Sequence, residues 1–141
     1  MSELLDEKIQ SVHRCVRYAR ADYRKAGDNF ADDYTLQNSA ILNLVRGCEQ
    51  VIDIANHLIK TRKLGLPADS RESFMLLQRE GVISHELASA LQKMVGLGKI
   101  TVHQYQELDI AMVATAIEKN SDDLIKFAEA AEFAGKSGDC P

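Results

Sequence analysis

Residues 33–61 read DYTLQNSAILNLVRGCEQVIDIANHLIKT, and this stretch decides the fold. Its apolar residues recur at alternating steps of three and four, which places them on one side of a helix close to a heptad seam. They are Ile41, Leu44, Cys48, Val51, Ala55 and Leu58. Asp33 suits the N-cap position, and Gly65 with Pro67 ends the pattern. The sequence therefore predicts a long helix with one buried face.

Similar periodicity covers most of the remaining chain. It predicts helices over about 2–24 and 109–133, with a short helix capped by Asp69 or Ser70 and another capped by Ser84 between them. Residues 99–105, KITVHQY, alternate polar and apolar residues as a strand would. A lone strand is unstable and no partner strand is evident, so we assign this segment to the end of the fourth helix and the following turn.

Together these elements predict an all-α fold, a four-to-five-helix up-and-down bundle with short connections. The chain has 141 residues, 45% of them hydrophobic, which is enough for one domain with one core. We expect the domain to span residues 1–133. The segment 134–141, rich in glycine and polar residues, is expected to be a disordered tail.

The amino-acid composition excludes several classes of function. The net charge of −4 predicts no broad electrostatic grip on nucleic acid, so any RNA must be handled at a small local site. No apolar run is long enough for a membrane span, and the charged first residues lack the apolar core of a signal peptide. Three scattered cysteines, Cys15, Cys48 and Cys140, fit a reduced cytoplasmic setting and argue against structural zinc. Phosphate-loop, dinucleotide and hydrolase motifs are missing from the sequence, and we expect no cofactor and no metal.

Two groups of polar residues could carry chemistry. One lies on helix 33–61 away from the apolar stripe, where Glu49, Asp53 and His57 follow each other at steps of four beside Arg46 and Asn56. Such a face is more often a solvated surface with intrahelical charge pairs. The other is His103 with Tyr105 two residues on; an imidazole can transfer protons near neutral pH. On chemistry alone, a lone histidine is more often structural.

Three stretches together resemble the HepT-type family of HEPN toxins. They are DDYTLQNSAILNLVRGCEQVIDIANHLI, LGLPADSRESFMLL and LQKMVGLGKITVHQYQELD, in this order and spacing. The similarity runs from near residue 8 to near residue 130. It implies a helical bundle that forms a symmetric homodimer, with the active cleft along the dimer interface. It also implies a metal-independent endoribonuclease, acting on tRNA or mRNA, with an MNT-type nucleotidyltransferase antitoxin as partner.

The family motif is an arginine, four to six residues, a histidine, and commonly a tyrosine two residues later. By resemblance, His103 supplies the imidazole for proton transfer at the scissile phosphate. Tyr105 matches the tyrosine that the antitoxin adenylylates. The arginine, which would clamp the phosphate, should stand at residue 98, and this chain has Gly98 followed by Lys99.

This departure predicts weak or absent RNA cleavage, because glycine offers no phosphate fork and loss of a transition-state donor commonly costs ~10²–10³ in rate. Lys99 or Arg46 could compensate, although we expect Lys99 to face another direction from His103. The alternatives are a non-catalytic HEPN module that pairs with a nucleotidyltransferase, and a purely structural bundle. His103 and Tyr105 favour the toxin, and Gly98 favours the non-catalytic module.

Two further predictions concern the cleft. The polar face of helix 33–61 should line the same cleft as His103, with Glu49 or Asp53 near the imidazole and Arg46 near the phosphate. Dimerisation should bury apolar residues from that helix or from the fourth helix.

Overall fold

The computed structural model describes the backbone of residues 3–103 and 109–138, and within these ranges every regular element is helical. The predicted all-helical class is confirmed. The elements are α1 (Glu3–Ala26), the short 3₁₀ turn η1 (Gly27–Asn29), α2 (Tyr34–Arg62), α3 (Ser70–Arg79), α4 (His85–His103), α5 (Ile110–Thr115), the π-helical turn η3 (Ala116–Asn120) and α6 (Ser121–Gly138).

The helices begin where the sequence supplies capping side chains. Asp33 accepts a hydrogen bond from the amide of Leu36 at 3.1 Å, and Asp69 accepts one from the amide of Glu72 at 2.9 Å. Ser84 accepts one from the amide of Leu87 at 3.1 Å. Each bond satisfies an amide that the first turn of the helix leaves without a partner.

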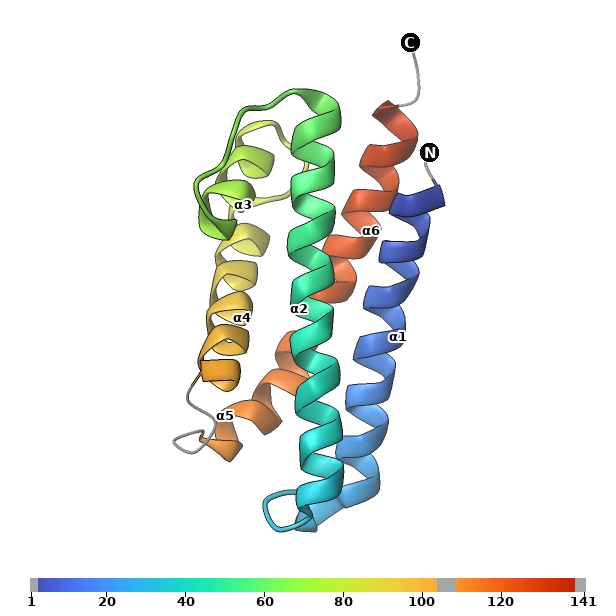
Figure 1. Ribbon diagram of the computed structural model, residues 1–141, viewed down its shortest axis with the longest axis vertical. Helices are drawn as coiled ribbons and strands as arrows, with labels where there is room; N and C mark the ends of the chain where they lie inside the picture. Colours follow the sequence, from blue (N-terminus) through green and yellow to red (C-terminus); the bar gives the residue numbers. More distant parts are fainter. Residues whose placement is uncertain (1–2, 104–108, 139–141) are drawn as a thin grey trace.

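The bundle runs up and down, as Figure 1 shows. The antiparallel α1 and α2 lie side by side, and α6 packs against both. The shorter α3 and the longer α4 stand on the other side of α2 (Figure 1). At one end of the bundle the guanidinium of Arg62 donates to the carbonyl oxygen of Ala134 at 2.8 Å, which ties the end of α2 to α6. The long α2 is therefore the central element, which contacts α1, α3, α4 and α6.

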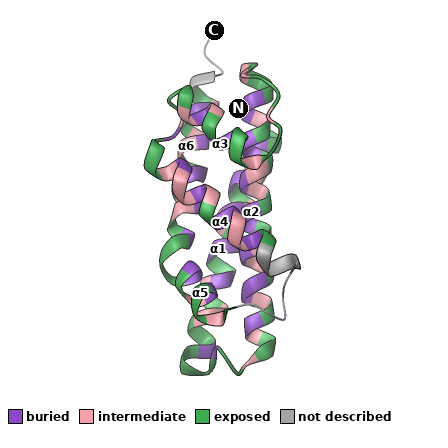
Figure 2. Cartoon of the chain, turned by 90° about the vertical axis from the view of Figure 1, so that its left-hand side faces the viewer, coloured by how far each residue is buried: buried purple, intermediate pink, exposed green. Residues whose placement is uncertain are grey.

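The predicted apolar stripes form the core. Figure 2 shows buried residues along the inward faces of the helices. The six stripe residues quoted for helix 33–61 are all buried, and so are Phe74, Leu77, Leu91, Met94, Val95, Val113, Ile117, Leu124 and Phe127. The rings of Phe74 on α3 and Phe127 on α6 meet edge to face at 6.0 Å between centroids. One continuous core thus joins the short α3 to the rest of the bundle.

Between α5 and α6 the chain stays helical but winds through the π-turn η3. Side chains of α1 contact this turn: the hydroxyl of Tyr23 donates to the carboxylate of Glu118 at 3.2 Å, and Nε of Arg20 donates to Oγ of Ser121 at 3.0 Å. Partial burial and this hydrogen bond raise the pKa of Tyr23. Tertiary contacts therefore accompany the local change in helical winding.

Of two segment boundaries, one agrees with the expectation and one differs from it. The backbone of KITVHQY is helical as far as His103, in agreement with its assignment to α4, and residues 104–108 lie outside the described ones. α6 runs past the expected end near residue 133 to Gly138, so part of the segment expected as a disordered tail is helical. Ala134 is buried there, which gives the extra turn a packing contact. Across the described residues, no helix combines the length and apolar character that a membrane span requires.

Candidate functional site

The end of α4 carries Gly98, Lys99 and the backbone of His103. Gly98 is buried, Lys99 is exposed, and His103 is the last described residue of α4. The side chain of His103 and the whole of Tyr105 lie outside the described parts of the structure. Because α4 is helical throughout, positions 99 and 103 are one turn apart and share a side of the helix. The direction in which the Lys99 side chain faces relative to the imidazole of His103 stays a prediction, because the side chain of His103 is not described.

A cavity of about 240 Å³ opens beside Gly98, between α2 and α4. Its lining residues are Val45, Cys48, Glu49, Ile52, Val95, Gly98 and Lys99. A Cβ atom at position 98 would lie 3.7 Å from the Cβ and Sγ atoms of Cys48, an ordinary van der Waals contact. The backbone therefore leaves room for a side chain at the position where the family motif has arginine.

Cys48 forms the apolar floor of this cavity. Its thiol is buried and donates to the carbonyl oxygen of Met94 at 3.7 Å. Burial, with a smaller contribution from the charge of Glu49, raises the pKa of Cys48 to about 12. The thiol is neutral at physiological pH, and a neutral thiol is a poor nucleophile. Cys48 is therefore a packing residue rather than a reactive one.

The polar residues of α2 lie beside two different neighbouring helices, α4 and α1. Glu49 lines the cavity with Gly98 and Lys99. Asp53, one turn later, forms an ion pair with Lys8 of α1 at 3.3 Å. Arg46 is exposed on the same helix. Whether Glu49 or Asp53 lies nearer the imidazole stays a prediction, because the side chain of His103 is not described.

Asn56, also on that face, contacts α3: its amide oxygen accepts a hydrogen bond from Oγ of Ser73 at 2.7 Å. Lys99 likewise reaches α3, where its Nζ donates to Oγ of Ser70 at 3.4 Å. The sequence marked Ser70 only as a candidate cap, and its contact with α4 has no local signal in the sequence. The end of α4 is thus joined to the start of α3.

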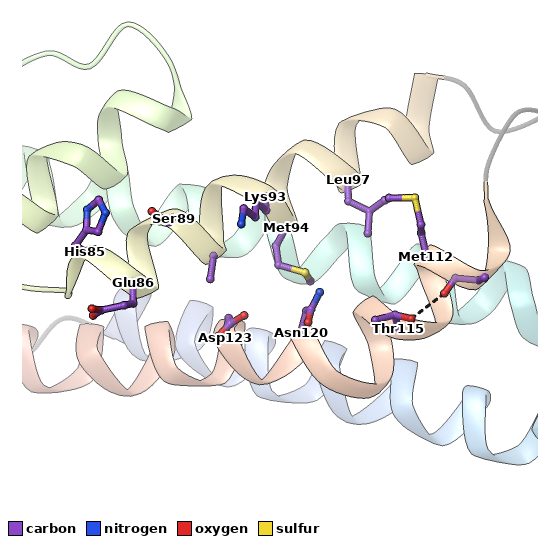
Figure 3. Close-up of a pocket in the computed structure, with 12 residues that line it drawn as sticks. His85, Glu86, Ser89, Lys93, Met94, Leu97, Met112, Thr115, Asn120 and Asp123 are labelled. Atoms are coloured by element: carbon purple, nitrogen blue, oxygen red, sulfur yellow. Dashed lines mark hydrogen bonds between the residues drawn. The ribbon is translucent and has the colours of Figure 1, made fainter.

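Another cavity, of about 910 Å³, lies on another side of α4 and opens between that helix and α5 to α6 (Figure 3). One end is polar, with His85, Glu86 and Asp123, and the other is apolar, with Leu97 and Met112. Neither Gly98 nor Lys99 lines it. Over the described residues, no three side chains of His, Cys, Asp or Glu lie close enough together to hold a metal ion.

Known proteins share this fold and much of this sequence. The chain matches the HepT-like family, described as ribonuclease HepT-like, over residues 5–131. It is 41% identical over 129 residues to the mRNA nuclease HepT of Shewanella oneidensis, covering 92% of this chain and 96% of that protein.

Two solved structures agree with this match. The tri-AMPylated HEPN toxin of Shewanella oneidensis in complex with its MNT antitoxin superposes with a TM-score of 0.88 at 39% identity, covering 94% of this chain and 99% of that one. A toxin–antitoxin crystal structure with AMP-PNP superposes with a TM-score of 0.87 at 39% identity, covering 93% and 99%. The resemblance drawn from the three sequence stretches is confirmed, and the chain belongs to the HepT-like ribonuclease family.

Proposed function

We propose that this chain is the toxin of a HEPN–MNT toxin–antitoxin pair and acts in the cytoplasm as a metal-independent endoribonuclease of reduced activity. The observation that carries the proposal is the end of α4, where His103 closes a helix that also presents Lys99 and an open cavity beside Gly98. Supporting it, the relative with 41% identity is an mRNA nuclease.

In this proposal His103 transfers a proton at the scissile phosphate, since an imidazole can both accept and donate protons near neutral pH. The charge that develops on the phosphate needs a cation. With Gly98 in place of arginine, the candidate cation is Lys99, which lies one helical turn before position 103 on α4. An ammonium group is a point charge without the two parallel donors of a guanidinium, so the reaction is slowed rather than abolished.

The experiment that tests this function is incubation of the purified protein with total RNA and with tRNA in the presence of a metal chelator. We expect slow cleavage by the parent chain and none by the variant His103→Ala. If the parent and the variant Gly98→Arg both left RNA intact, the chain would be a non-catalytic HEPN module. That second function is favoured by one observation, the glycine at position 98.

The proposed partners are a second copy of the chain and an MNT-type nucleotidyltransferase that adenylylates Tyr105. The solved relative, an AMPylated toxin bound to its MNT antitoxin, supports the second partner. For the homodimer, support comes from α2, which leaves Leu42 half exposed and Tyr34 more so. Light scattering coupled to size exclusion should give a mass about twice the 15.7 kDa of one chain; a mass of one chain would contradict the dimer.

A further inference from the structure

Arg71, Lys93 and Lys99 line a groove of about 340 Å³ between the start of α3 and α4. The other lining residues are Ser70, Ser89, Gln92, Val95 and Gly96, so its described walls hold three cations and no carboxylate. This concentration of positive charge stands out in a chain whose net charge is −4.

These cations are not used to stabilise the fold through ion pairs. The ion pairs of the described residues involve Lys8, Arg20, Lys126 and Lys136 as cations, and none of the three groove cations takes part. Arg71 and Lys93 are exposed, and the side chain of Lys99 donates a 3.4 Å hydrogen bond to Ser70, its one hydrogen bond to the described part of the chain. Three unpaired cations side by side repel each other, so an anion in the groove would relieve that repulsion.

The groove is continuous with the candidate catalytic site through one residue. Lys99 lines both this groove and the cavity that contains Glu49 and Gly98. A second groove, of about 560 Å³, meets the first at Ser70 and adds Lys60 and Lys63 at the end of α2. Its one carboxylate, Asp69, is occupied by capping α3. A strip of cations therefore leads from the motif across the start of α3.

We propose that this strip binds the sugar–phosphate backbone of a single-stranded RNA beside the scissile phosphate, with Lys99, Lys93 and Arg71 neutralising successive phosphates. The inference rests on the proposed ribonuclease function and adds to it a substrate-binding surface outside the motif. A line of cations whose one carboxylate, Asp69, is occupied in capping α3 fits a polyanion of extended shape. Phosphate contacts of this kind position a nucleic acid without reading its sequence.

The test is RNA binding by the double variant Arg71→Gln, Lys93→Gln, which removes two positive charges and leaves Lys99 and His103 in place. The matched control, Arg24→Gln with Lys25→Gln, removes the same charge at exposed positions in the last turn of α1, which lies on the other side of α2 (Figure 1). The probe is a short fluorescein-labelled single-stranded RNA with 2′-O-methyl riboses, and fluorescence anisotropy reports binding without cleavage. Thermal unfolding followed by circular dichroism checks that both variants keep the fold.

We expect the groove variant to bind the RNA about tenfold more weakly than the parent at ~0.1 M salt. The slope of log binding constant against log salt concentration should be shallower by about 1.4, because each phosphate contact to a single strand contributes about 0.7 to that slope. The α1 control should bind as the parent does. Equal binding by parent and groove variant, equal loss in both variants, or no binding by the parent would overturn the inference.

The cleavage assay separates this inference from the proposed function. If the parent cleaves RNA while the groove variant binds RNA as tightly as the parent, the proposed RNA-binding groove is wrong and the proposed ribonuclease function is retained. If the groove variant loses binding while neither the parent nor Gly98→Arg cleaves, the RNA-binding surface stands without the catalytic function.

Discussion

The two sides of α2 differ in how completely they are filled. On one side α1 and α6 approach closely: at Gly47 an added Cβ would lie only 3.3 Å from Leu124 of α6 and 3.6 Å from Cys15 of α1. On the other side α3 and α4 leave cavities, and at Gly98 the nearest atoms to an added Cβ are 3.7 Å away. The filled side supplies stability, and the open side carries the motif and the cation strip.

The largest loss of stability is expected on the filled side of α2, from truncating Leu124. This side chain is fully buried where α1, α2 and α6 meet. Leu124→Ala should lower the free energy of unfolding by about 3 kcal/mol, because the rigid packing cannot close the cavity that is left. Urea denaturation measures this value. A loss below ~1 kcal/mol would mean that the filled side relaxes as easily as the open one.

A smaller effect is expected on RNA cleavage, where Glu49 and Asp53 of α2 should differ. In a Gly98→Arg background, Glu49→Gln should slow RNA cleavage by about tenfold, because Glu49 lines the cavity into which the guanidinium would extend and a charge-assisted hydrogen bond is lost. The matched change Asp53→Asn should leave the rate within about twofold, since the partner of Asp53 is Lys8 of α1. Single-turnover cleavage rates decide the point, and equal losses would remove the distinction between the two acids.

The two glycines offer a finer contrast in stability. Both lie inside helices, where alanine is favoured over glycine by up to ~1 kcal/mol. Gly98→Ala should gain most of this difference, because its new methyl group meets only ordinary contacts. Gly47→Ala should gain less, since the side chain of Leu124 has to shift by a few tenths of an ångström. Thermal midpoints of the two variants give the ranking, and a larger gain at position 47 would contradict it.

The smallest effect should come from the surface of the filled side. Asp53→Asn breaks the ion pair with Lys8, but the side chain of Asp53 is 53% exposed. An exposed pair of this kind contributes about 0–1 kcal/mol, and salt screens it further. Urea denaturation at low and high salt should show a difference near the lower end of that range. A loss that persists undiminished at high salt would mean that the pair is effectively buried.

The sequence predicted the elements whose signals are local. Asp33, Asp69 and Ser84 begin helices because a side-chain oxygen can satisfy the next free amides, and this depends only on nearby residues. The apolar steps from Ile41 to Leu58 predicted the buried face of α2 for the same reason. The family resemblance added the residues of the candidate site, which periodicity alone could not single out.

Contacts between segments that are distant in the chain could not be predicted from the sequence. Glu118 in the π-turn meets Tyr23 of α1, and Ser121 directly after the turn meets Arg20, each about a hundred positions away in the chain. Glu49 and Asp53 look equivalent at a spacing of four, and only the positions of α1 and α4 give them different neighbours. The groove between α3 and α4 joins Arg71 to Lys93 and Lys99, which no sequence pattern connects.

We propose that the open cavity beside Gly98 marks the position of the missing arginine of a weakened ribonuclease. Its most direct test is the single-turnover rate of metal-free RNA cleavage by the parent and by Gly98→Arg, with Gly98→Arg, His103→Ala as the control. We predict that Gly98→Arg is faster by ~10²–10³ and that the added His103→Ala change removes this gain. Equal rates for the parent and Gly98→Arg would contradict the account, because they would show that position 98 takes no part in the reaction.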